Sequence, residues 1–239
     1  MIIPNYVPGP LEVEGNVGAS RYRDRLRFLR TVVHGNTLFT GLILAASYLP
    51  WPDMGVRTSV FLWLAVVIGL DLFRIFKREL PIEAKVSAWM LPLLGLSLSW
   101  VLHEIVARGG FVWPLFVAIA LQSCYALVCG RDFSFVGFFF LPWIASLFAL
   151  GVFGVAGKVS SEGMSLSLWA CSGWLFYTAY DLSMIMRRRR IGEEFAAILD
   201  IHRDFLNIFG YFPRVIAHWK KHHIWVEVKG EINRSFDGR

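Results

Sequence analysis

The side chains best suited to chemistry in this sequence are three aspartates that lie in otherwise apolar surroundings in the last third of the chain. Asp181 lies in YTAYDLSMIM at 177–186, while Asp200 and Asp204 lie in LDIHRDFLNIF at 199–209. Two carboxylates that meet in a low dielectric cannot both ionise at low free-energy cost. Such a pair is expected to share a proton at low pH. Once both groups are charged, it is expected to repel itself and to attract a cation.

Two of these acids are predicted to meet, because Gly192 lies almost midway between them, 11 residues after Asp181 and 12 before Asp204. Gly192 suits a turn, and Glu193 and Glu194 suit the positive end of a helix that starts just after it. In an antiparallel pair of helices joined at this turn, the two carboxylates reach about the same depth.

The second helix of this pair carries its polar residues on one face. They follow at intervals of 4, 3, 4, 3 and 4, which is helical spacing, and are Asp200, Asp204, Asn207, Tyr211, Arg214 and His218. One interpretation is an amphipathic helix that lies on a membrane surface. The narrow polar stripe, with no lysine before Lys220, favours the other interpretation, a seventh helix inside a bundle whose stripe faces an aqueous cavity.

Charged and polar side chains near these acids give a simpler alternative, in which the acids only join helices by sharing a proton or binding an arginine. Arg203, or Arg74 together with Asp71, is the partner predicted for that role. Glu104 is predicted to lie at the outer end of its helix, where it would gather cations or be a plain interfacial charge. The residues predicted as counter-charges or as part of an ion pathway are Asn207, Arg203, Asp71, Arg74, Glu104 and Arg214.

The composition indicates that membrane helices must position these residues. The chain has 239 residues, of which 56% are hydrophobic and 18% are charged, and its mean hydropathy is +0.52. Soluble domains carry about 25% charged residues, so a single soluble core is excluded, as are a disordered chain and a disulfide scaffold. The three cysteines, Cys124, Cys129 and Cys171, lie in apolar runs and are predicted to be small buried residues.

Six runs of about 20 residues are apolar enough to cross a hydrocarbon layer of about 30 Å as helices. They contain almost no charged residues and lie at 31–50, 58–76, 86–106, 111–130, 133–156 and 165–186. The predicted fold is an all-α integral membrane protein, a seven-helix bundle with six spanning helices around the polar-striped C-terminal helix. Its predicted parts are a flexible N-terminal arm at 1–20, a single transmembrane helical domain at 21–218 and a basic C-terminal tail at 219–239.

The basic residues indicate how the bundle is oriented. Lys and Arg collect in the cytoplasmic loops of membrane proteins. Fourteen lie on the side of the N-terminus, whereas the opposite loops hold only Arg57, Arg108 and Lys158. The N-terminus is therefore predicted to be cytoplasmic. Because topology accounts for the formal charge of +6, no nucleic-acid partner is predicted. With no organelle signal visible, the expected location is a bacterial inner (cytoplasmic) membrane.

The two aspartate segments resemble those of the transmembrane Bax inhibitor motif family. Members of that family have one aspartate in a (F/Y)DTQ segment and another in an LYLDFxNLF segment. Asp181 in YTAYDLSMIM and Asp204 in LDIHRDFLNIF occupy these positions. Weaker similarities are RLRFLRTVV before the first apolar run, SLSWVLHEIV at the end of the third and GRDFSF at the start of the fifth.

The resemblance implies a bundle with its last helix at the centre and a pH-sensitive calcium leak across a membrane. Asp181 and Asp204 would act as proton sensor and gate, with Asp200 beside them. Calcium prefers about 6–8 oxygen ligands, so Asp181 and Asp204 would bind it weakly as the permeant ion. No tightly bound cofactor is expected, and the implied partners are the lipid bilayer, calcium and protons.

Two other functions stay open at this point. The main alternative is a non-conducting membrane regulator that binds another membrane protein, of the protease-modulating or cell-death-modulating type, and the basic tail at 219–239 would suit such docking. A remote alternative is an intramembrane aspartyl protease, which also needs two carboxylates. The sequence lacks the Gly-x-Gly-Asp and Pro-Ala-Leu segments of those proteases, so an enzyme is not predicted.

Overall fold

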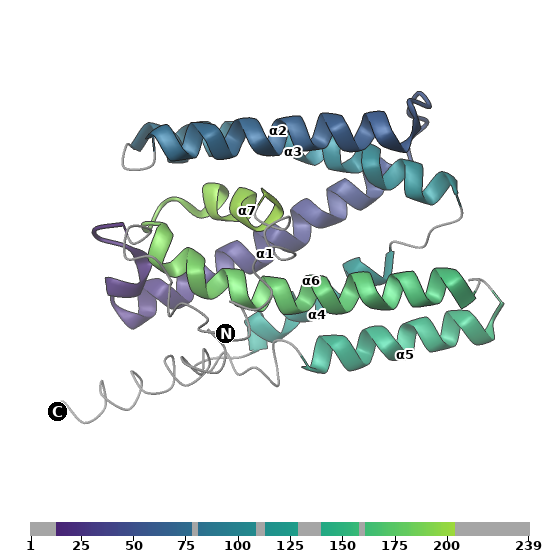
Figure 1. The fold of residues 1–239 in the computed structure, drawn as a ribbon. Coiled ribbons are helices and arrows are strands. Elements are labelled where there is room, and N and C mark those ends of the chain that lie inside the picture. Colours follow the sequence, from purple (N-terminus) through teal and green to yellow (C-terminus); the bar gives the residue numbers. More distant parts are fainter. Residues whose placement is uncertain (1–12, 78–80, 109–112, 129–139, 158–160, 204–239) are drawn as a thin grey trace, which may run out of the picture.

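The computed structural model describes residues 13–77, 81–108, 113–128, 140–157 and 161–203, and within these ranges every regular element is a helix (Figure 1). The elements are a short 3-10 helix η2 (Val17–Ala19), α1 (Tyr22–Ser47), α2 (Gly55–Lys77), α3 (Pro81–Ala107), α4 (Trp113–Val128), α5 (Leu141–Val155), α6 (Ser161–Arg188) and α7 (Glu194–Arg203). The predicted all-α class is confirmed for this part of the chain.

Two of the helices are long and apolar enough to cross a membrane, at Gly55–Arg74 in α2 and at Ile82–Ala107 in α3. Shorter apolar stretches lie in α4, at Phe116–Val128, and in α5, at Leu141–Val152. The helix α1 begins well before the apolar run predicted there and includes the preceding arginine-rich segment, because arginine and leucine favour helix formation.

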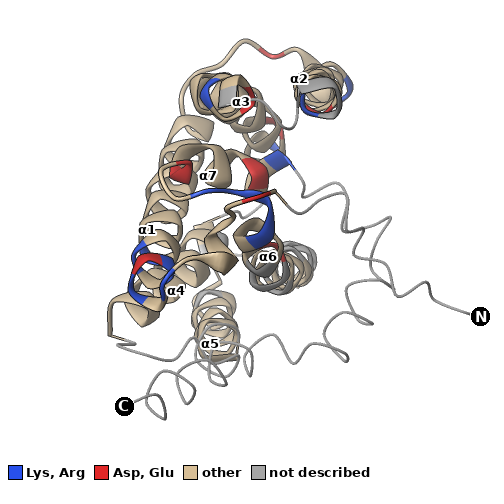
Figure 2. Cartoon of the chain, turned by 90° about the vertical axis from the view of Figure 1, so that its left-hand side faces the viewer, with Lys and Arg blue, Asp and Glu red and all other residues tan. Residues whose placement is uncertain are grey.

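The short helix α7 lies between the other helices. It contacts α1, α2, α3 and α6. Figure 2, which views the bundle from one end, shows α7 with α2 and α3 on one side and α6 on the other. The remaining contacts place α2 along α3, α1 against both α3 and α4, and α5 against both α4 and α6. A helix in this position can join elements that are far apart in the sequence.

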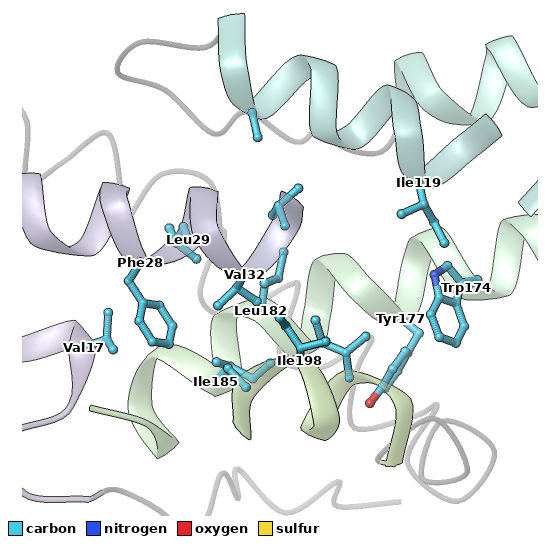
Figure 3. Packing of buried hydrophobic residues seen from close by; sticks show 14 residues of the cluster. Val17, Phe28, Leu29, Val32, Ile119, Trp174, Tyr177, Leu182, Ile185 and Ile198 are labelled. Atoms are coloured by element: carbon cyan, nitrogen blue, oxygen red, sulfur yellow. The ribbon is translucent and has the colours of Figure 1, made fainter. Parts of the chain in front are cut away.

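The main hydrophobic cluster lies where η2, α1, α6 and α7 meet (Figure 3). Phe28 of α1, Ile185 of α6 and Ile198 of α7 are each at most 3% exposed. Burying a side chain of this size contributes about 1.5–3 kcal/mol. The approach of α1 to α7 depends on Gly35, since a Cβ atom at that position would overlap the side chain of Ile198.

Two predictions differ from the structure. Residues 13–20, predicted to belong to a flexible arm, contain η2, which contacts α6 and α1 and buries Val17 completely. The apolar side chain of Val17 and two backbone N–H groups that bond to the end of α6 explain this fixed position. Cys124, predicted to be buried, is exposed on α4, because an apolar sequence does not tell which face of a helix points outward.

Candidate functional site

The turn before α7 is built as the sequence predicts. Gly192 has a φ of 95°, a left-handed conformation that glycine adopts without a steric penalty. The side chain of Glu193 accepts a hydrogen bond from the backbone N–H of Arg190, and that of Glu194 accepts one from Gly192. The two acids thus satisfy backbone donors of the turn and place negative charge at the positive end of α7, and the helix enters the bundle from this turn.

Arg189 follows the last residue of α6 and binds two acids from different helices. Its Nε and Nη2 donate to the carboxylate of Asp200 in α7, at 2.7 and 2.8 Å. Its Nη1 and Nη2 donate to the carboxylate of Glu83 in α3, at 2.5 and 3.2 Å. Burial alone would lower the pKa of Arg189, but the charges and hydrogen bonds of Asp200 and Glu83 outweigh it and raise the pKa above its ordinary value. Arg189 therefore stays charged.

A second arginine extends the network toward α2. Arg203 of α7 is fully buried. Its Nη2 lies 2.6 Å from Oδ1 of Asp200, and its Nε lies 2.9 Å from Oδ1 of Asp71 in α2. Arg74 of α2 approaches Asp200 from the same side, with its Nη1 3.6 Å from Oδ1. One carboxylate, that of Asp200, therefore faces three guanidinium groups.

We call these six residues the charge cluster: Asp71, Arg74, Glu83, Arg189, Asp200 and Arg203. Its three carboxylates and three guanidinium groups balance in formal charge. The side chains of Asp200 and Arg203 are completely buried, whereas that of Asp71 is 39% exposed. The charge cluster thus extends from the centre of the bundle to its surface beside α2.

His202 attaches α7 to a different part of the bundle. Its ring is 1% exposed and packs edge-on against Phe39 of α1 and obliquely against Trp174 of α6. The Nδ1 atom lies 3.0 Å from the carbonyl oxygen of Ile198, to which it can only donate, and Nε2 lies 3.2 Å from the hydroxyl of Thr40. The charge cluster therefore holds one side of α7, and the packing of His202 against Phe39 and Trp174 holds another.

Asp181 is buried on α6, at 1% exposure. It precedes Arg189 by eight residues, which is about 12 Å at helical rise, and it lies 11 residues before Gly192, as many as separate Arg203 from Gly192 on α7. Its predicted partner Asp204, and the predicted pathway residues Asn207 and Arg214, lie outside the described residues. Asp200, predicted as part of the same proton- and ion-sensing set, is instead placed among arginines.

Glu104 lies near the other end of α3, 21 residues after Glu83 and therefore about 32 Å from it along the helix. It is 2% exposed, and its Oε2 accepts a hydrogen bond of 2.7 Å from Arg108 one turn later. The charge cluster and Glu104 thus mark opposite ends of α3. That Glu104 lies at the outer end with respect to a membrane stays a prediction.

Glu83 and Arg189 are two functional residues that the sequence does not predict. Glu83 lies in a short basic segment, and Arg189 is one of four consecutive arginines, so both look like solvated charges of cytoplasmic loops. A weak signal in the sequence is that Glu83 is one of two acids, with Glu79, in a segment where lysine and arginine dominate. The residues that the structure does bring together from the predicted set are Asp71, Arg74, Asp200 and Arg203.

The arrangement of the charge cluster is suited to holding helices together. A cation placed beside Asp200 in this conformation would meet the positive charges of three arginines. Among the residues that the structure describes, no three His, Cys, Asp or Glu side chains lie close enough to hold a metal ion. The calcium ligands that the resemblance implies, Asp181 and Asp204, include one residue outside this part of the chain.

Comparisons of this chain with protein-family models, with curated proteins and with solved structures return no match. The similarity of the two aspartate segments to the Bax inhibitor family therefore stays a prediction from the sequence, and the site is interpreted from its own geometry.

Proposed function

We propose that this chain is a pH-sensitive cation leak protein of a cellular membrane, with calcium as the permeant ion, and that the described conformation is its closed state. The observation that carries the proposal is the position of α7. This helix bears Asp200, His202 and Arg203, and all three are buried between apolar helices. Ionisable groups inside a membrane bundle are costly and mark ion or proton pathways by default.

The membrane setting is supported by the outer surface of the bundle. Large apolar side chains that are at least 71% exposed lie on α1, α2, α3, α5 and α6, namely Leu38, Phe61, Trp89, Phe148 and Trp169. In water such surfaces promote association, whereas in hydrocarbon they are stable. We therefore assign membrane-spanning roles to the six helices α1 to α6, with α7 among them and the N-terminus in the cytoplasm.

The proposed gate is the pair Asp181 and Asp204. At low pH the two carboxylates share a proton and hold α6 to the C-terminal helix at the cytoplasmic mouth. At higher pH both are charged, so they repel each other and present oxygen ligands to calcium. The leak is therefore expected to rise with pH. Weak binding suits this role, because a permeant ion must leave the site as well as enter it.

The charge cluster has a separate role in this proposal. Because its formal charges already balance, it holds α7 in place without needing a proton. It anchors α7 to α2, α3 and the end of α6 through Asp200 and Arg203, and Arg203 directly precedes the proposed gate residue Asp204. Titration of the gate would then act next to a fixed attachment of the helix.

The test is calcium entry into dye-loaded liposomes that contain the purified protein, measured from pH 5 to pH 8. We expect the leak of the parent protein to rise with pH. Asp181→Asn and Asp204→Asn remove the charge at the gate, so each should give a low leak that no longer depends on pH. Asp53→Asn, in the loop before α2, serves as a control and should keep the parent profile. A pH profile that both gate variants leave unchanged would refute the gate.

One observation favours a second candidate, the non-conducting regulator that binds another membrane protein. Asp200 faces three arginines, which join the helices tightly and disfavour a cation beside this carboxylate. The same liposomes separate the two functions. If the folded parent protein gives no calcium leak above that of empty liposomes at any pH, the regulator is the better description.

A further inference from the structure

The segment before α1 is fixed to the end of α6 by backbone hydrogen bonds. The N–H of Val13 donates to the carbonyl of Arg187 at 3.1 Å, and the N–H of Val17 donates to the carbonyl of Arg189 at 2.8 Å. Carbonyl groups at the end of a helix have no partner within the helix. The segment therefore completes the C-terminal end of α6, much as another turn of helix would.

Side chains strengthen this attachment. Val17 is 0% exposed and belongs to the hydrophobic cluster with Phe28 and Ile185 (Figure 3). The segment is itself shaped by Asn16, whose side chain accepts from the N–H of Ala19 and donates to the carbonyl of Val13. These contacts give residues 13–19 a defined conformation that is part of the fold.

The segment is attached next to Arg189, whose guanidinium group binds both Asp200 and Glu83. We call these two attachments the Arg189 clamp. The acceptors of the segment are the carbonyls of Arg187 and Arg189, and Arg190 donates from Nε to the carbonyl of Glu14 at 3.1 Å. Residues 13–17 thus bind the carbonyls of Arg187 and Arg189 and the side chain of Arg190. The guanidinium group of Arg189 binds Asp200 inside the bundle. A shift of this backbone would displace the donor atoms that bind α7.

We infer that residues 13–20 form an N-terminal strap that positions Arg189 and thereby keeps α7 locked in the bundle. Release of the strap would loosen the Arg189 clamp and let α7 open. The effect on ion leak rests on the function proposed above, whereas the effect on α7 does not. The strap is a positioning element: it acts through Arg189 and touches neither Asp200 nor Asp181 in the contacts described.

The test measures the accessibility of α7 directly. Ala196, which is 1% exposed on α7, is replaced by cysteine in the full chain after Cys124, Cys129 and Cys171 are changed to serine. The rate of maleimide labelling then reports opening. We expect Val17→Asp to raise this rate at least about tenfold, because a charge cannot remain in the hydrophobic cluster. Ala19→Asp adds the same charge at an exposed position of the strap and should leave the rate unchanged.

A double-mutant comparison tests whether the strap acts through Arg189. Arg189→Gln alone should also raise the labelling rate, and adding Val17→Asp to it should raise the rate no further. If Val17→Asp yields too little folded protein, Val17→Ala replaces it, with an expected increase of a few fold. Equal labelling of the parent and the Val17 variants would overturn the strap, as would full additivity with Arg189→Gln.

Calcium leak in the same variants separates this inference from the proposed function. If the strap and the channel are both correct, Val17→Asp raises the leak at low pH several fold. Faster labelling of α7 in a protein that gives no calcium leak at any pH would support the strap and contradict the channel. Unchanged labelling in a protein whose leak still responds to pH would support the channel and overturn the strap.

Discussion

Arg189 shows why one residue type is needed at the centre of the site. The planar guanidinium group offers donors on two edges, so it can bind Asp200 along one edge and Glu83 along another at the same time. A lysine ammonium carries the same charge but lacks this fixed fork. The clamp between α3 and α7 therefore depends on the shape of the arginine side chain as well as on its charge.

This dependence predicts the effect of substitutions on stability. Arg189→Gln leaves the buried carboxylate of Glu83 without its hydrogen-bonded arginine and takes one of three arginines from Asp200, so it should lower the free energy of unfolding by about 3–5 kcal/mol. Arg189→Lys keeps the charge and should cost less. The matched control is Arg190→Gln, which removes a surface ion pair with Glu193 and an exposed hydrogen bond to the carbonyl of Glu14 and should cost at most about 1 kcal/mol. Denaturant unfolding in detergent micelles gives the values, and equal losses at both positions would contradict the clamp.

Glu83 and its partner Arg189 show which part of the site cannot be predicted from the sequence. Asp200 lies on the polar face of the helix predicted after Gly192, and Arg203, Asp71 and Arg74 are the charges predicted as its partners; the structure brings these four together. Glu83 was not selected, because its partner lies 106 residues away and no local pattern links the two. Pairing over such a distance depends on how the helices pack, which a single sequence does not specify.

At the scale of elements, periodicity and turn chemistry were sufficient for much of the fold. Charge-free runs predicted the helices, and Gly192 with the two acids after it predicted the start of α7. The start of α1 is harder to predict from the sequence, because its first two turns carry charges that a search for apolar runs excludes. The position of residues 13–20 was missed because it depends on a single buried valine and on backbone groups.

The contact of α1 with α7 gives a prediction at this scale. A Cβ atom at Gly35 would overlap the Cδ1 atom of Ile198. Overpacking of about 1–3 kcal/mol, offset by the gain of about 0.5–1 kcal/mol from replacing a helical glycine, should make Gly35→Ala less stable than the parent by up to about 2 kcal/mol. Shortening the opposing side chain with Ile198→Val should recover part of that loss in the double variant. Gly69→Ala in α2 meets no atom within 4 Å and should be neutral or stabilising by about 0.5–1 kcal/mol. Unfolding midpoints of the four proteins test this, and a Gly35→Ala variant as stable as the parent would contradict it.

At the scale of the whole molecule, the proposed topology places the start of α2 outside the cell and the start of α3 in the cytoplasm. Lys85 lies near the start of α3 and Arg57 near the start of α2, and both are exposed. In a cysteine-free background, Arg57→Cys should react with a membrane-impermeant maleimide added outside intact cells. Lys85→Cys should react only after the membrane is opened. The reverse pattern would invert the proposed orientation, and labelling of both positions in intact cells would contradict a crossing between them.

The long separation between Glu83 and Arg189 also has a consequence for how the molecule is assembled. During synthesis, α3 is complete well before the ribosome reaches the arginines after α6. Until then Glu83 lacks Arg189, the counter-charge that stabilises its burial. The early hairpin of α2 and α3 is therefore incomplete. Arrival of the final helices therefore closes the bundle, and a chain that stalled earlier would expose an unsatisfied acid that marks it as incomplete.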